Sequence, residues 1–305
     1  MASNVALPPN IWQNGTAEST ALLLEKALKS ELHRFKAGHD EFRGARPYPH
    51  HVLDNLFPDA LLDLVDDEFP DPTQPLGNAA ACKIAAKERG HHWHCTAHGT
   101  GNGGNLKIGT PEEVGMGAST RALMRFFKRP SFVRHLEMLT GIGPLVVDET
   151  NVGAGLHQIL HNGSLQLHAD FNRHPSLMLE RRVNVFLYLN SRWDTSWGGD
   201  LELWDKTLST CSQSIAPHRN RLVVFASTDF SYHGHPAPLA CPPHRSRRSI
   251  AIYYYTAGVR PEEEVNATAR KKFPRTTLYR KGSCDGRCAS SKEAAGFPFC
   301  PSGRR

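Results

Sequence analysis

The chain has 305 residues, of which 39% are hydrophobic and 22% charged, as in a soluble globular protein with one large domain or two small ones. No run of 18 or more apolar residues occurs, which excludes an ordinary transmembrane helix, and the segment MASNVALPPNIWQNG lacks the layout of a secretory signal. The net charge of +6 resides in residues 259–305, which hold 11 Lys and Arg against 5 Asp and Glu. The rest of the chain is neutral, which argues against nucleic acid as a partner.

The first half of the chain predicts helices around one short strand. Leucines at helical spacing indicate a helix over residues 18–37, and a strand over 49–57 precedes a helix over 58–69. Residues 71–118 are rich in Gly, Pro and Thr and predict mostly loop. Residues 119–141 predict one helix, or two interrupted at Pro130, that end at Gly141.

The second half has the composition of short strands separated by turns. The predicted segments are 155–160, 164–170, 181–190, 198–205, 211–217, 220–227 and 248–256. No helical crossover separates them, which favours a sandwich or barrel over a parallel sheet. The predicted fold class is therefore mainly β with α: a double-stranded β-helix (jelly roll) preceded by supporting N-terminal helices.

We predict three parts along the chain. A helical extension covers residues 1–45, and a catalytic domain covers 46–258 with its ligand-bearing core at about 155–256. A basic tail that contains cysteines covers residues 259–305.

The stretch SLQLHADFN carries a possible metal-binding pair. On an extended chain His168 and Asp170 share one face, because side chains alternate across a strand. Two histidines and one carboxylate form the facial triad that binds iron(II), so a third ligand is needed from a distant strand. The segment NRLVVFASTDFSYHGHP offers His233 after an apolar strand and a turn, and His235 stays open as the alternative.

Four elements in order then resemble a known family. LHADF, VFLYLNSRWDTSWGGDLELW, SYHGHP and RRSIAIYY are similar to motifs of the iron(II)- and 2-oxoglutarate-dependent dioxygenases, in particular the prolyl 4-hydroxylase-like branch. The resemblance implies that His168, Asp170 and His233 are the iron ligands. It implies that Arg247 binds the distal carboxylate of 2-oxoglutarate and that Tyr188 hydrogen-bonds it.

The arginine that binds 2-oxoglutarate has two alternatives, because RSRRS also contains Arg245 and Arg248. The family pattern selects Arg247, with Ser249 on the same strand face, whereas Arg248 points to the other side and stays as the alternative. Asn184 is expected to face the same way as Tyr188 and to line the site.

The resemblance implies an oxidoreductase with Fe(2+), 2-oxoglutarate and O2 as cofactor and cosubstrates, and L-ascorbate as reductant. Such an enzyme hydroxylates an unactivated C–H bond of a prolyl residue, an amino acid or another small metabolite and releases succinate and CO2. The expected partner is a small-molecule or peptidyl substrate, with no nucleic acid and no membrane. The alternatives are a nucleic-acid or protein demethylase on the same fold and a non-enzymatic metal-binding jelly roll, which should lack the late-strand cation.

The remaining histidines and cysteines are expected to be structural. Residues 91–98, HHWHCTAH, could form a zinc site, but structural zinc usually uses two separated ligand pairs, so we favour a polar loop. His157 and His161 are expected in the core or lining the site. The seven cysteines, among them Cys284, Cys288 and Cys300, are interpreted as reduced thiols of a cytoplasmic protein.

Overall fold

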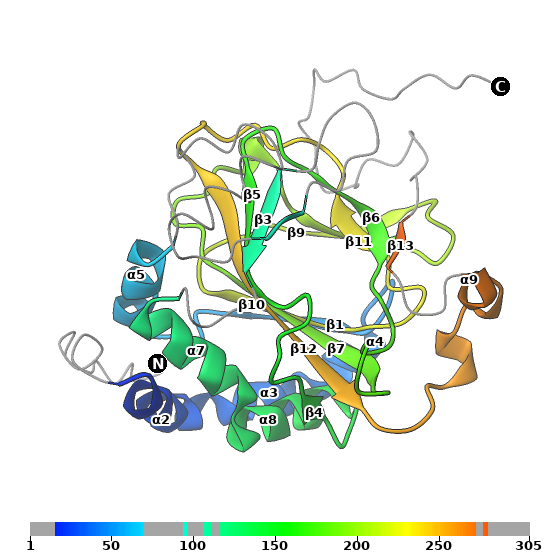
Figure 1. Cartoon of the computed structure of the whole chain (residues 1–305), viewed down its shortest axis with the longest axis horizontal. Helices are drawn as coiled ribbons and strands as arrows, with labels where there is room; N and C mark the ends of the chain where they lie inside the picture. Colours follow the sequence, from blue (N-terminus) through cyan, green and yellow to red (C-terminus); the bar gives the residue numbers. More distant parts are fainter. Residues whose placement is uncertain (1–15, 70–93, 97–105, 111–115, 273–276, 280–305) are drawn as a thin grey trace.

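The structure is a computed structural model that describes residues 16–69, 94–96, 106–110, 116–272 and 277–279. Two antiparallel β-sheets face each other, and helices cover the outer side of the larger sheet (Figure 1). Apolar side chains from both sheets meet between them, including Tyr188 and Phe225 from one sheet and Leu201 and Leu203 from the other. No helix in these ranges is long and apolar enough to cross a membrane.

All strand pairs within the two sheets are antiparallel. The larger sheet has the order β1 (His50–Asp54), β10 (Arg221–Ala226), β7 (Glu180–Tyr188), β12 (Ser246–Thr256), β5 (Gly155–Leu160), β3 (Lys107–Thr110) and β2 (His94–Thr96), and β4 (Val146–Val147) also pairs with β12. The smaller sheet has the order β13 (Leu278–Tyr279), β6 (Leu165–Ala169), β11 (His233–His235), β8 (Leu201–Trp204) and β9 (Cys211–Ile215). This arrangement confirms the predicted jelly-roll fold.

Strand β7 shows how the sequence builds two layers from one sheet. Its residues Val183, Val185 and Leu187 belong to the core that packs on the helices. The alternate residues Phe186 and Tyr188 pack in clusters on the opposite face of the sheet. Because side chains alternate along a strand, one face stabilises the helical layer while the other is available for the site.

The helical layer joins the N-terminal segment to the segment just before the β-rich half. It consists of α2 (Ala17–Leu28), η1 (Lys29–Glu31), α3 (Leu32–Ala37), α4 (His39–Gly44), α5 (Asp59–Asp67), α7 (Ala118–Lys128) and α8 (Pro130–Thr140). Helices α7 and α8 are separate because Arg129 is extended before Pro130, and α8 ends at Gly141, whose φ of 68° suits glycine. Tyr254 of β12 fixes the sheet to this layer by donating its hydroxyl to the Phe127 carbonyl at 2.7 Å.

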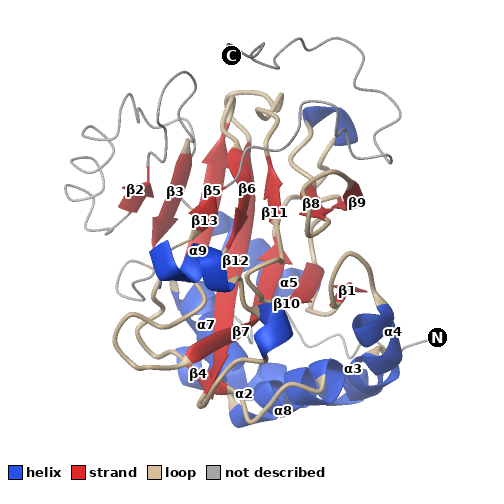
Figure 2. Cartoon of the chain, turned by 90° about the vertical axis from the view of Figure 1, so that its right-hand side faces the viewer, coloured by secondary structure: helices blue, strands red, loops and turns tan. Residues whose placement is uncertain are grey.

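Every predicted strand segment of the second half contains a strand, but five further strands were missed, among them the two-residue strands β4 and β13. β2 and β3 lie in the segment predicted as loop, at the left edge of the strands in Figure 2. β11 lies where a turn and a loop histidine were expected. Beyond the sheets, η3 (Thr195–Trp197), η4 (Glu262–Glu264) and α9 (Ala267–Lys272) complete the described elements.

Candidate metal centre

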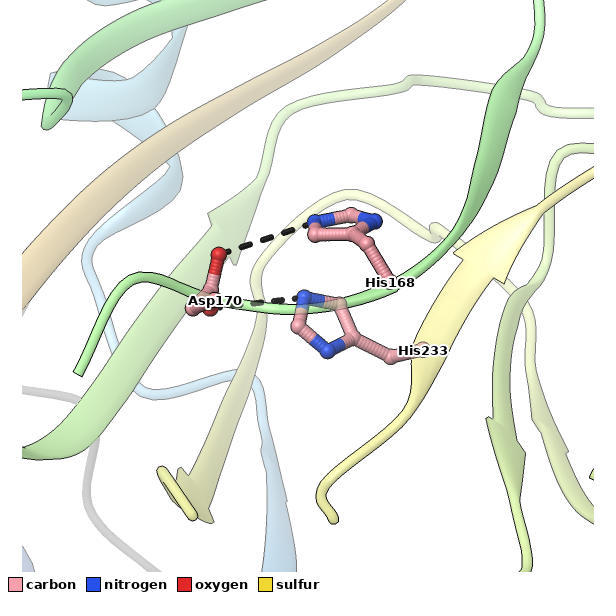
Figure 3. Close-up of side chains that lie close together, drawn as sticks. All are labelled: His168, Asp170 and His233. Carbon is pink, nitrogen blue, oxygen red and sulfur yellow. Dashed lines mark ion pairs between the residues drawn. The ribbon is translucent and has the colours of Figure 1, made fainter. Parts of the chain in front are cut away.

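Strands β6 and β11 bring the three predicted ligands together. His168 lies on β6 and Asp170 directly follows it, while His233 begins β11 and pairs in register with His168. Their ligand atoms all lie within 4.8 Å of one another, and all three residues are buried. Figure 3 shows the two imidazoles turned toward the carboxylate from neighbouring strands.

The hydrogen bonds of the two imidazoles fix which nitrogen could bind a metal. His168 Nδ1 lies 2.7 Å from the Gln166 carbonyl and His233 Nδ1 lies 2.9 Å from the Ser231 carbonyl. A carbonyl can only accept, so each Nδ1 carries the proton and each Nε2 keeps its lone pair. Both Nε2 atoms lie 3.6 Å from an oxygen of Asp170, so three electron-pair donors face one another.

This donor set fits a divalent cation. Three lone-pair donors that converge without an intervening proton need a positive charge between them, and two histidines with one carboxylate are typical of non-haem iron(II). Burial lowers the pKa of His233 to about 4, which keeps its imidazole neutral and able to bind a metal at neutral pH. Although burial alone would raise it, the pKa of Asp170 is held well below its usual range by the Arg181 guanidinium.

Arg181 orients Asp170 and was missed in the sequence. It is 1% exposed, its Nη2 donates to Asp170 Oδ2 at 2.8 Å and its Nε donates to Asn184 Oδ1 at 2.8 Å. Asn184 Nδ2 donates to the same Asp170 oxygen at 2.7 Å, which closes a triangle of hydrogen bonds. The guanidinium also lies over the Tyr253 ring, 3.3 Å from its centroid. An arginine in an alternating strand gives no signal of this role, because it is also common on exposed faces.

Arg247 and Tyr188 lie together on the inner face of the larger sheet. Arg247 is 5% exposed, donates from Nη2 to the Tyr188 hydroxyl at 3.0 Å and donates from Nε to the Gly199 carbonyl at 2.5 Å. Gly199 has a φ of 81°, and a Cβ there would lie 3.0 Å from Arg247 Cδ. Ser249 lies opposite Tyr188 in the strand pairing, so Arg247, Tyr188 and Ser249 lie together as predicted from the sequence.

The alternative cations point elsewhere. Arg248 donates to the Asp66 carboxylate at 2.7 Å on the helical side of the sheet, and Arg245 contacts the Ser191 carbonyl. The alternative histidine, His235, is not among the three residues whose donors converge. It is 2% exposed, and neither ring nitrogen has a hydrogen-bond partner of good geometry in the described part of the chain.

The other histidines and cysteines give a mixed result. His157 donates to the Gly153 carbonyl at 3.1 Å and His161 contacts the Cys241 carbonyl at 2.5 Å, so both are structurally engaged. The segment 91–98, predicted as a polar loop rather than a zinc site, and the residues Cys284, Cys288 and Cys300 lie outside the described residues, apart from the backbone of 94–96.

The prediction of reduced thiols is wrong for Cys211, which is disulfide-bonded, whereas Cys241 is a buried free cysteine. Disulfides persist mainly in oxidising compartments, so the thiols no longer support the prediction of a cytoplasmic protein.

Residues 154–255 match the sequence model of the 2OG-Fe(II) oxygenase superfamily, and this range contains all three residues of the triad together with Arg247 and Tyr188. This part of the chain belongs to that superfamily. The 2OG-Fe(II) oxygenases are oxidoreductases that use iron(II) and 2-oxoglutarate, and the protein is an enzyme of this class.

Solved structures similar to the oxygenase include three prolyl hydroxylases. A prolyl 4-hydroxylase from Phytophthora capsici is 18% identical, with 81% of this chain and 73% of that chain covered and a TM-score of 0.46. One from Pseudomonas putida is 14% identical, with coverage of 74% and 95% and a TM-score of 0.39. A Trichoplax adhaerens prolyl hydroxylase in complex with a hypoxia inducible factor peptide is 15% identical, with coverage of 74% and 93% and a TM-score of 0.46. Comparison with curated proteins gives no match.

Proposed function

We propose that the protein is an iron(II)- and 2-oxoglutarate-dependent dioxygenase that hydroxylates an unactivated C–H bond of a small-molecule or peptidyl substrate. The observation that carries this proposal is the convergence of His168, Asp170 and His233 within 4.8 Å, with both imidazole Nε2 atoms directed at the carboxylate. One substrate C–H bond, one O2 and one 2-oxoglutarate would yield one alcohol, succinate and CO2. L-Ascorbate as reductant, a prolyl substrate and a cytoplasmic location stay predictions.

Each residue of the group has a separate task. Iron(II) supplies the oxidising chemistry when bound with 2-oxoglutarate and O2. His168 and His233 would hold it through Nε2, while their Nδ1 protons stay fixed on backbone carbonyls. Arg181 and Asn184 donate to one oxygen of Asp170, Oδ2, so its other oxygen, Oδ1, would be available to hold the metal.

Arg247 would bind the distal carboxylate of 2-oxoglutarate through its planar guanidinium. Because Tyr188 already accepts a hydrogen bond from Arg247 through its oxygen, its own proton can be donated to the same carboxylate. Burial raises the pKa of Tyr188, so this proton stays in place at physiological pH. The cosubstrate would thus be held at both ends.

Anaerobic titration of the apoprotein with iron(II) and 2-oxoglutarate tests the proposal. We expect a visible charge-transfer band in the wild type and none in His168→Ala, because the variant lacks one metal ligand. Circular dichroism of both proteins serves as the control for folding. A folded wild-type protein that binds stoichiometric iron and shows no band contradicts the proposed function.

A further inference from the structure

Lys107 lies on the inner face of the larger sheet, close to the candidate metal centre. It pairs with Ile159 of β5, and Ile159 pairs with Arg247 of β12. Residues directly opposite each other on antiparallel strands project from the same face of the sheet. Lys107 therefore shares the inner face with Arg247, two strands away, and strand β3 places a third, half-buried cation beside the site.

The charged groups of the candidate metal centre act on the ammonium group of Lys107. Burial lowers the pKa of its ammonium group to about 8, and among charged neighbours the Asp170 carboxylate acts most strongly, ahead of Arg247 and Arg181. The ammonium therefore lies within range of the charges of Asp170, Arg247 and Arg181. It stays largely protonated at pH 7, and no carboxylate in the described ranges forms an ion pair with it.

His235 provides a second unsatisfied polar group on the facing sheet. It lies two residues after His233 on β11, so its side chain projects from the same face of that strand. Among the described residues neither buried ring nitrogen has a hydrogen-bond partner of good geometry, although the Ala237 backbone acts on the ring as a weak acceptor. A buried polar group without a partner destabilises the protein, and a bound polar ligand would offset this cost.

The charge balance of the proposed holoenzyme indicates what this ligand is. Arg181 is already paired with Asp170, and Arg247 is assigned to the distal carboxylate of 2-oxoglutarate. Iron(II), Asp170, 2-oxoglutarate and the two arginines together leave an excess of positive charge, to which Lys107 adds. A buried cation is stable when an anion accompanies it. The remaining anion has to come with the substrate.

We propose that Lys107 and His235 form a subsite for a carboxylate group of the substrate, which makes the protein a hydroxylase of a carboxylic acid. The subsite rests on the proposed function, because it assigns Arg247 to the cosubstrate and leaves Lys107 to the substrate. Lys107 would bind the carboxylate as a cation, and His235 would donate a hydrogen bond to it.

The test is calorimetric titration of the protein loaded with Mn(II) and 2-oxoglutarate, with propionate and its neutral isostere propionamide as probes. We expect saturable binding of propionate at millimolar concentration and at least tenfold weaker binding of propionamide. Lys107→Met should lower the affinity for propionate at least tenfold, and His235→Phe should lower it at least threefold. Lys107→Arg should lower it by less than threefold, because the positive charge is kept. The affinity for 2-oxoglutarate, measured from the iron(II) charge-transfer band, should change less than twofold in Lys107→Met.

Three results would overturn the subsite. Equal affinities for propionate and propionamide, or no binding of either, would show that no carboxylate site exists beside the centre. A Lys107→Met variant that loses affinity for 2-oxoglutarate and keeps it for propionate would assign Lys107 to the cosubstrate. Failure of the proposed function gives a different result, since the wild type would then show no charge-transfer band at all.

Discussion

At the scale of single residues, the charge of the candidate centre depends on one buried arginine. Arg181 compensates Asp170 in a part of the molecule that water hardly reaches, since its side chain is 1% exposed and that of Asp170 is 11% exposed. Removing one partner of a buried ion pair leaves an uncompensated charge and typically costs about 3–5 kcal/mol. A metal ion bound to Asp170 would supply the missing positive charge.

Arg181→Met should therefore destabilise the apoprotein by about 3–5 kcal/mol and make its stability more dependent on metal. The measurement is the melting temperature with and without Mn(II), and the rise on adding metal should be larger in the variant than in the wild type. Arg182→Met is the matched control, because Arg182 pairs with Glu264 and not with Asp170. If Mn(II) raises the melting temperature equally in Arg181→Met and in the wild type, Arg181 does not compensate the charge of Asp170.

The two neighbouring arginines of β12 allow a second comparison. Arg247→Met should weaken 2-oxoglutarate binding by about a hundredfold, because a charge-assisted pair with a carboxylate contributes about 1.5–3 kcal/mol. Arg248→Met should leave that affinity within about twofold, because its partner is Asp66 on the helical side. Titration of the charge-transfer band measures both, and a larger loss in Arg248→Met would show that the cosubstrate site has been placed on the wrong face.

At the scale of elements, the pairing of β11 with β6 decides the site. His233 is opposite His168 in this pairing, and the register shifts before His235 is reached, where Leu165 becomes the partner. His233 is therefore the histidine of β11 that lies beside His168 and Asp170. The choice between His233 and His235 is thus made by strand register, which the local sequence HGH leaves open.

The N-terminal helix α2 tests whether the proposed extension over residues 1–45 is part of the folded unit. It packs against α7, with Leu24 fully buried and Leu22 44% exposed. Leu24→Ala should lower the free energy of unfolding by about 2–5 kcal/mol, and Leu22→Ala by no more than about 0.5 kcal/mol. Chemical denaturation followed by tryptophan fluorescence measures both, since three of the five tryptophans, Trp193, Trp197 and Trp204, lie in the β-rich half. If Leu24→Ala leaves the midpoint of that transition unchanged, α2 unfolds independently.

At the scale of the whole molecule, the pH dependence of stability reflects a partly buried acid outside the centre. Glu202 of β8 accepts a hydrogen bond from Trp204 Nε1 at 2.8 Å, and burial raises the pKa of Glu202 to about 7. The native protein holds this proton more tightly than the unfolded chain. The stability that the protonated Glu202 side chain contributes is therefore complete below the unfolded pKa of 4.5. It is lost as the pH rises through 7.

Glu202→Gln imitates the protonated acid and should remove this loss. We expect the variant to be about 1–2 kcal/mol more stable than the wild type at pH 8.5 and to match it near pH 4. Urea denaturation across this range measures the difference, with Glu149→Gln on the surface as the control. A stability difference that does not change with pH would refute the raised pKa.

The sequence by itself determined most strands of the β-rich half, the helices before them and the residue types of the triad. Strand periodicity and turn residues depend on neighbours in the chain, which is why the segments from Gly155 to Thr256 were predicted closely. The spacing of His168 and Asp170 likewise follows from local alternation alone. Strands β2 and β3 were missed because short edge strands in a segment rich in glycine carry little local signal.

Only the tertiary structure decided which distant side chains act together. The selection of His233 over His235 depends on the pairing of β11, and the separation of Arg247 from Arg248 depends on which face of β12 meets the helices. The hydrogen bond from Arg181 to Asp170 depends on β7 lying opposite β6, the strand that carries His168. These contacts join residues far apart in the chain, and their energies depend on burial and register, which the order of amino acids does not display.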